Sequence, residues 1–197
     1  MKNKQTPKQR EIVKCARRII TSKGVENLTI AELAKELKLT QGAIYRHFRS
    51  KKEIIGLLID DIEKTLLETV EQAANTSDNP LDKLENILLA HLSYASQRKG
   101  VSFIVINETL SLKDKSLQRK MLGAIHKYLN KITEILLEGQ GANLFRKDIN
   151  TTVGSIAFFG MVQSMVTIWA LSGFKYSLNK NRLQELFDIY KEGVNAK

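Results

Sequence analysis

Three helix-start signals lie within the first 53 residues of this chain, and they constrain its fold more than any other feature. Each is a capping box, in which a Thr or Ser is followed three residues later by Gln or Glu. The pairs are Thr6 with Gln9, Thr29 with Glu32, and Ser50 with Glu53. Each box predicts that a helix begins directly after the hydroxyl residue. The N-terminal region is therefore predicted to be a group of short helices followed by a longer one.

Further helix boundaries follow from glycines, prolines and polar turns. Gly24 ends the first helix, which opens with Thr6 and Pro7, and Thr40 caps a third short helix. Few segments alternate in the manner of strands, and Pro80 is the only proline besides Pro7. We therefore expect an all-α fold of about nine helices. They are expected near residues 7–23, 30–37, 41–48, 51–74, 80–98, 101–112, 114–138, 149–172 and 179–194.

The positive charge of the chain is concentrated at its N-terminal end. Residues 1–52 hold 14 Lys and Arg against 4 Asp and Glu, whereas residues 53–197 hold 17 of each. The first quarter of the chain therefore carries its whole net charge of +10. A basic head on a neutral body is typical of a protein that binds a polyanion. A surface that only keeps the protein in solution would not need this concentration of charge.

The expected setting of the chain is the reducing cytoplasm. A single cysteine, Cys15, excludes an intrachain disulfide, and the N-terminal residues lack the apolar run of a secretory signal. Residues 153–171 have the length of a membrane span and lie in a stretch, 149–174, that contains no charge. The polar residues among them, and the lack of a second such segment, favour a buried helix instead. Such a helix would pack on its own core and on a partner subunit.

The second and third predicted helices have the lengths and the short connection of a helix-turn-helix. On a helical wheel Ile44 and Phe48 form an apolar side of the helix at 41–48, and Gly42, Ala43 and Arg46 lie opposite. One side can then anchor the helix while the other enters the major groove of DNA. Candidate base contacts are Gln41 and Arg46, and candidate phosphate contacts are Thr29, Tyr45, His47 and Lys51.

The residues of this region resemble the TetR family of bacterial transcriptional regulators. The matching residues are Ile12–Ala16, Gly24, Leu28 and Thr29, Leu33 and Ala34, Leu39–Phe48, and Lys51. The resemblance implies a DNA-binding head at residues 1–50 and a helical ligand-binding and dimerisation domain at residues 51–197. It also implies the DNA-facing positions, which are Thr29, Gln41, Gly42, Ala43, Tyr45, Arg46, His47 and Lys51.

Two residues depart from the family pattern. Lys38 stands in the turn where the family has Gly, so we expect a non-glycine residue in the left-handed conformation there, at a cost of about 1 kcal/mol. Cys15 replaces the usual Ala, which exchanges one small side chain for another. Neither departure changes the prediction of DNA binding.

A ligand pocket is expected among the helices of the body. Met and aromatic side chains suit apolar ligands of irregular shape, although they belong to a helical core more often than to a pocket. The candidates are Phe103, Asn107, Met121, His126, Phe158, Met161, Gln163, Met165 and Trp169. The uncharged wall favours a small amphipathic or apolar effector. The last two predicted helices faintly resemble those of fatty-acid-responsive members of the family, and they are expected to form a four-helix dimer interface.

The sequence indicates no catalytic site, no cofactor and no metal site. The histidines are far apart, hydrolase and nucleotide-binding motifs do not occur, and one cysteine cannot form a cysteine-rich zinc site. We therefore expect a homodimeric, ligand-released repressor of a pseudo-palindromic operator, with no enzyme activity and no membrane association. Two alternatives stay open. One is a helical carrier or enzyme for lipids or small molecules, with a basic head that docks on acidic membranes. The other is an architectural protein that binds DNA of any sequence.

Overall fold

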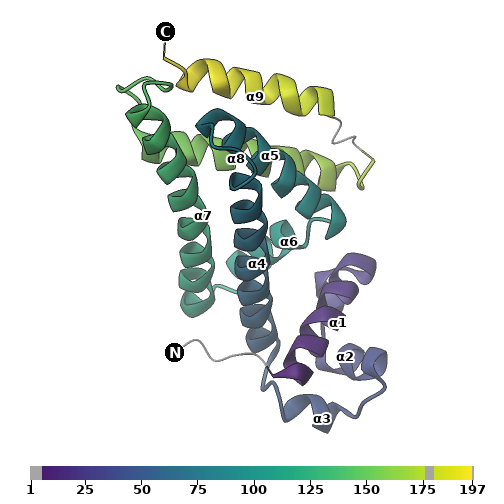
Figure 1. The fold of residues 1–197 in the computed structure, drawn as a ribbon. Helices are drawn as coiled ribbons and strands as arrows, with labels where there is room; N and C mark the ends of the chain where they lie inside the picture. Colours follow the sequence, from purple (N-terminus) through teal and green to yellow (C-terminus); the bar gives the residue numbers. More distant parts are fainter. Residues whose placement is uncertain (1–5, 176–179, 197) are drawn as a thin grey trace. The chain divides into compact units, whose positions relative to one another are not determined.

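The computed structural model describes residues 6–175 and 180–196, with no side-chain detail for residues 180 and 181. Within these ranges the chain contains one isolated β-bridge, between Phe145 and Asn195, and no β-strand. The elements are α1 (Pro7–Lys23), the 3₁₀ turn η1 (Val25–Asn27), α2 (Ile30–Leu37), α3 (Gln41–Tyr45), α4 (Lys51–Ala74), α5 (Pro80–Gln97), α6 (Val101–Ser111), α7 (Lys115–Gly141), α8 (Thr151–Leu171) and α9 (Lys180–Val194), as Figure 1 shows. The predicted all-α fold is confirmed for this part of the chain.

Hydrogen bonds at the start of α1 confirm its capping box. The Thr6 hydroxyl accepts from the Gln9 N–H (3.2 Å), and the Gln9 side chain accepts from the Thr6 N–H (3.0 Å). At the start of α2 the Thr29 hydroxyl accepts from the Glu32 N–H (3.1 Å), while the Glu32 carboxylate pairs with Lys23 of α1. The second signal therefore both starts a helix and ties it to its neighbour.

The segment between α3 and α4 corrects two predictions. The Glu53 carboxylate accepts a hydrogen bond from the Arg49 N–H (2.8 Å), which lies one residue before the predicted capping residue. The helix predicted at 41–48 ends at Tyr45. The Phe48 N–H still bonds to the Ile44 carbonyl (3.0 Å), so the last predicted turn is present as a hydrogen-bonded turn rather than as α-helix.

α7 is longer than its glycines predict, because it continues through Gly139 to Gly141. A Cβ atom at Gly139 would lie 2.0 Å from the ring of Phe145, which is buried. The glycine therefore allows a close approach of that ring and does not end the helix. The predicted start of the last helix, at residue 179, lies outside the described residues.

The chain forms two compact units. The first comprises the residues up to Glu63 together with Gly100–Leu122, and the second comprises Lys64–Lys99 together with the chain from Gly123 onward. α4 and α7 each begin in the first unit and continue into the second. The predicted boundary at residue 50 separates two functional domains and not two compact units. It stays a prediction.

The core of the first unit anchors α3. Leu28, Leu33 and Ile44 are fully buried, and α1 adds a row of buried side chains, which are Ile12, Val13, Cys15, Ala16, Ile19 and Ile20. Burying a side chain such as Ile44 contributes about 2 kcal/mol. An ion pair between Arg17 and Asp61 (3.0 Å) fastens α1 to α4. A helix as short as α3 depends on this packing, because so few residues are marginal as an isolated helix.

The second unit contains a polar pair inside its apolar core. α8 packs against α5 and α9, and Tyr190 of α9 donates a hydrogen bond to the Gly154 carbonyl (3.0 Å). His91 of α5 shares a hydrogen bond with the Tyr128 hydroxyl (3.0 Å), and both residues are buried. Burial lowers the pKa of His91 to about 4, so its ring is neutral at physiological pH.

Candidate nucleic-acid interface

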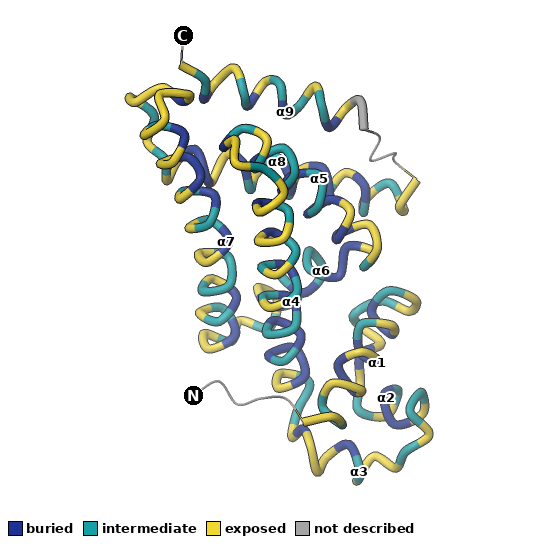
Figure 2. The backbone as a smooth tube through the Cα atoms, in the orientation of Figure 1, coloured by how far each residue is buried: buried dark blue, intermediate teal, exposed yellow. Residues whose placement is uncertain are grey.

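α3 has one buried and one exposed face. The Thr40 hydroxyl accepts from the Ala43 N–H (3.1 Å) and starts the helix. Ile44 and Phe48 point into the core, with 0% and 1% of their surface exposed. The exposed positions are Gln41, Gly42, Tyr45, Arg46 and His47, with Ala43 partly exposed, and Figure 2 shows this division along α3. The arrangement presents a polar face on a rigid base, which is what a groove-reading helix needs.

The turn that leads into α3 is held by backbone hydrogen bonds. Lys38 ends α2 in the left-handed conformation (φ 53°, ψ 41°), which confirms the expectation for a non-glycine residue at this position. The Leu39 N–H bonds to the Ala34 carbonyl (2.8 Å), and the Lys38 N–H bonds to the Lys35 carbonyl (3.2 Å). These bonds satisfy carbonyls at the end of α2 and set its angle to α3.

Glycine at position 42 is not required by the protein itself. A Cβ atom there would meet only the Thr40 hydroxyl, at 3.9 Å, and its φ is not in the left-handed region. Internal packing therefore leaves room for a larger residue. The remaining reason for glycine at this position is that another molecule can approach the backbone closely.

Lys51, a candidate phosphate contact, has two partners within the first unit. Its ammonium group donates to the Val25 carbonyl (3.0 Å) and pairs with the Glu108 carboxylate of α6 (3.0 Å). Glu108 is largely buried. An ammonium group has three donors, so one is left for an outside acceptor. Lys51 thus joins the start of α4 to η1 and to α6.

Acidic partners are distributed unevenly over the head. Glu36 pairs with both Arg18 (3.0 Å) and Lys23 (2.7 Å), so these two cations of α1 are neutralised there. The hydrogen bond from Lys23 is the main cause of the lowered pKa of Glu36. Among the described residues the side chains of Lys35, Lys38 and Arg46 have no carboxylate partner. Lys14 of α1 and Arg49 after α3 have none either, so the uncompensated positive charge of the head includes α2, α3 and the turn between them but is not confined to them.

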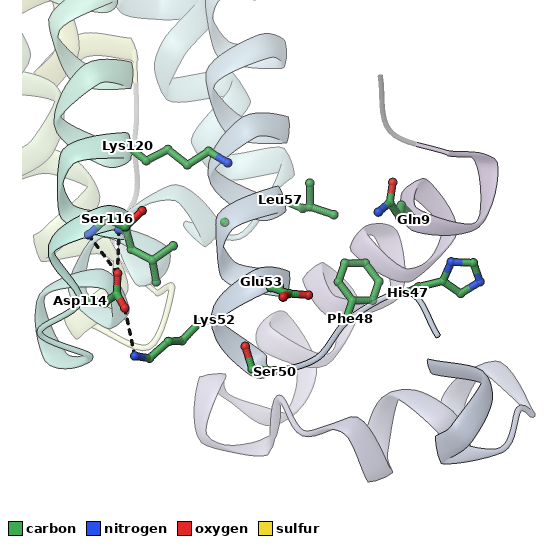
Figure 3. Close-up of a pocket in the computed structure, with 12 residues that line it drawn as sticks. Gln9, His47, Phe48, Ser50, Lys52, Glu53, Leu57, Asp114, Ser116 and Lys120 are labelled. Carbon is green, nitrogen blue, oxygen red and sulfur yellow. Dashed lines mark hydrogen bonds and ion pairs between the residues drawn. The ribbon is translucent and has the colours of Figure 1, made fainter. Parts of the chain in front are cut away.

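A hollow of about 530 Å³ adjoins the end of α3 within the first unit (Figure 3). Its lining combines residues of both charges with apolar ones: Gln9, His47, Phe48, Ser50, Lys52, Glu53, Gly56, Leu57, Asp114, Ser116, Leu117 and Lys120. Lys52 pairs with Asp114 (3.0 Å), which also accepts from the N–H groups of Ser116 (3.0 Å) and Leu117 (3.1 Å). The hydrogen bond from Lys52 is the main reason that the pKa of Asp114 is lowered. The ion pair between Lys52 and Asp114 at this hollow thus connects the start of α4 to the residue before α7.

The nine candidate ligand residues are not gathered around either described hollow. Phe103, Asn107 and Met121 belong to the first unit, and His126, Phe158, Met161, Gln163, Met165 and Trp169 belong to the second. Phe158 packs on the buried Tyr190, and the buried Trp169 contacts the exposed Phe174, while Asn107 and His126 are exposed. A smaller hollow, of about 370 Å³, lies in the second unit and is lined by Leu67, Glu71, Lys127, Asn130, Lys131 and Glu134. The role of the nine candidates in ligand binding stays a prediction.

α8 carries a second exposed face, and this one is apolar. The side chains of Val153, Ile156, Ile168 and Leu171 are exposed at helical spacing, with the small residues Ala157, Gly160 and Ser164 between them. Ile189 of α9 is also 71% exposed. α8 is the one described helix long and apolar enough to span a membrane, a test that the core helix of a soluble protein also passes.

Among the described residues no group of three potential metal ligands is found.

Comparison with known proteins covers both units. The family described as bacterial regulatory proteins, tetR family, matches residues 12–57, and the YsiA-like protein C-terminal region matches residues 59–190. The nucleoid occlusion factor SlmA of Photobacterium profundum is 23% identical over 195 residues, which cover 98% of this chain and 97% of that protein. The fatty acid metabolism regulator protein of Bacillus subtilis (strain 168) is 25% identical over 178 residues, which cover 90% and 91%. The solved structure of the regulator FadR from Bacillus subtilis in complex with stearoyl-CoA has a TM-score of 0.80 at 21% identity and covers 94% of this chain and 99% of that one.

Proposed function

The chain belongs to the TetR family of bacterial regulatory proteins, and we propose that it is a homodimeric repressor that a small effector releases from its operator. The observation that carries this proposal is the exposed polar face of α3, which is anchored by Ile44 and Phe48 and surrounded by cations without carboxylate partners. The chain then acts through binding alone and needs no catalytic group or cofactor. Since a DNA operator of a bacterial cell is reached from the cytoplasm, we place the protein there and not on a membrane.

In the complex, α3 lies in the major groove. Gln41 and Arg46 bond to base edges, for which an Arg opposite guanine is the most common pairing. Gly42 and Ala43 keep this face slim, so that the backbone approaches the bases. Phosphate contacts come from Tyr45, His47, the free donor of Lys51, and Thr29, whose hydroxyl can donate while it accepts from α2.

The exposed apolar face of α8, with Ile189 of α9, is the proposed contact with a second copy of the chain. A twofold axis brings the same patch of each subunit together, and the small residues at positions 157, 160 and 164 allow the two α8 helices to approach closely. A dimer then places its two α3 helices in successive major grooves, about 34–36 Å apart, on a pseudo-palindromic site.

The effector is proposed to be an amphipathic molecule with a long apolar part, and an acyl-CoA is the first to test. The support is the solved relative bound to stearoyl-CoA, together with the uncharged α8. α4 continues from the unit that holds α3 into the other unit, so a change in its tilt can transmit binding. The effector must bind the non-DNA conformer more tightly, because equal affinity for both conformers shifts nothing.

The test of the DNA-binding role is a mobility shift with the variant Tyr45→Ala. The probes are a duplex selected from a random pool by the unaltered protein and a duplex of random sequence. Leu122→Ala is the matched control, because Leu122 and Tyr45 are both 52% exposed and lie in the same unit. We expect Tyr45→Ala to weaken binding and the control to bind as the unaltered protein does. Equal binding by both variants would refute the interface.

A further inference from the structure

From the turn before α3, we infer that Lys38 is an additional phosphate contact that adds one charge to the DNA interface. The TetR resemblance places Gly at this position, so the contact would be particular to this chain. The inference rests on the proposed role of α3. It is separate from that role, because α3 can read its site whether or not Lys38 takes part.

The position of Lys38 relative to α3 is set by the backbone. Its Cα is two residues before Thr40, the residue that caps α3, so the two Cα atoms are at most about 7.6 Å apart. The hydrogen bonds of the turn hold Lys38 in a left-handed conformation. An exposed side chain with a four-carbon stem then leaves the protein beside the start of the recognition helix. When the start of α3 enters the groove, this side chain is long enough to reach toward a phosphate at the edge of the groove.

The charge around Lys38 also favours an outside partner. Glu36, the carboxylate two residues before Lys38, is already paired with Arg18 and Lys23 of α1. In the described part of the chain the ammonium of Lys38 has no carboxylate within ion-pair distance, and neither has that of Lys35. An ammonium group without an internal partner breaks no ion pair when it turns toward a phosphate, and each such contact releases a counterion from the DNA.

The left-handed conformation by itself does not carry this inference. Lys99 and Lys113 also have positive φ values, 49° and 51°, two residues after the ends of α5 and α6. A cation at the end of a helix is favoured there by the helix dipole, whatever the protein binds. The feature peculiar to Lys38 is its place next to α3. Lys99 and Lys113 therefore serve as controls, because they have the same residue type and a similar positive φ.

The deciding variant is Lys38→Gly, since glycine adopts a positive φ without strain and the folded state is expected to be at least as stable. With one phosphate contact in each subunit of the proposed dimer, the slope of log K against log salt concentration should become shallower by about 1.8, which is about 0.9 for each contact. Affinity should fall by the same factor for the selected duplex and for the random-sequence duplex, because a phosphate contact carries no sequence information. Lys38→Arg should retain the slope of the unaltered protein.

Lys113→Gly and Lys99→Gly remove the same charge at positions with a similar positive φ. Both should leave the salt slope unchanged while they alter the melting temperature as Lys38→Gly does. If Lys38→Gly has the same slope as these controls, Lys38 does not contact DNA and the inference is wrong. Tyr45→Ala, measured in parallel, separates this result from a failure of the proposed function, because only a wrong interface leaves both Tyr45→Ala and Lys38→Gly binding normally.

Discussion

The exposed faces of α3 and α8 differ in chemistry, and the difference predicts two kinds of partner. The face of α3 is short and polar, with Arg46 on it and Lys35 and Lys38 beside it, and it stands on a buried base. The face of α8 is long and contains no charged residue from Thr151 to Leu171. A cationic polar face suits a polyanion, whereas an apolar face of this length suits a surface like itself. Under the proposed function, one chain thus separates recognition of DNA from recognition of its own copy.

The largest expected effect comes from a charge on the α8 face. Ile156→Glu would bury an unpaired carboxylate in the proposed dimer interface, at a cost of about 3–5 kcal/mol. Sedimentation velocity should show monomers at concentrations where the unaltered protein is dimeric, and binding to the selected duplex should weaken with it. Leu110→Glu, at a similarly exposed position on α6, should stay dimeric. If the Ile156→Glu variant is still dimeric, the two subunits do not contact each other through α8.

The core of the second unit contains a buried histidine, His91, that should make the stability of the chain depend on pH. The pKa of His91 is about 4 in the folded chain, below the ordinary value of 6.5. Below pH 6.5 the unfolded chain binds a proton that the folded chain does not. The stability due to neutral His91 is therefore complete above that pH and is lost as the pH falls toward 4, by about 3 kcal/mol in total.

Urea unfolding at several pH values measures this loss. The variant His91→Gln keeps a hydrogen-bonding group for Tyr128 but does not titrate, so its stability should depend less on pH between about 4 and 6.5. If both proteins have the same pH dependence in that window, the buried histidine is not its source.

A smaller effect is expected on the α3 face. Arg46→Ala should weaken binding to the selected duplex by about 1–3 kcal/mol and relax specificity at one base pair. Arg18→Ala is the control in the same head, because Arg18 is exposed but bonds to Glu36. Affinities for duplexes with single base changes give the comparison. Unchanged specificity in Arg46→Ala would remove this residue from base recognition.

The parts of the fold that depend on local interactions could be predicted from the sequence. The starts of α1, α2 and α4 follow from side chains within a few residues of the helix end, and Thr6 and Thr29 make the expected bonds. The buried side of α3 follows in the same way from the spacing of Ile44 and Phe48. The left-handed turn at Lys38 was predictable from the family pattern.

Contacts between distant segments could not be predicted in this way. His91 bonds to Tyr128, 37 positions away, and Lys51 pairs with Glu108 across a still longer gap in the sequence. Neither pair has a spacing that a single sequence can indicate. The end of α7 was predicted wrongly for a related reason. Gly139 is needed for the close approach of the Phe145 ring, and the sequence alone does not distinguish this need from a helix end. The candidate pocket residues rest on residue type alone, which does not distinguish core from pocket.

Hydrogen exchange of the full chain, with and without the selected duplex, tests the central claim most directly. We predict slower exchange on DNA binding in the segment 29–51, strongest around Thr40 to His47, with α8 unchanged because it is already covered in the dimer. Protection confined to α8 and α9, with the amides of α3 exchanging as in the free protein, would contradict the account.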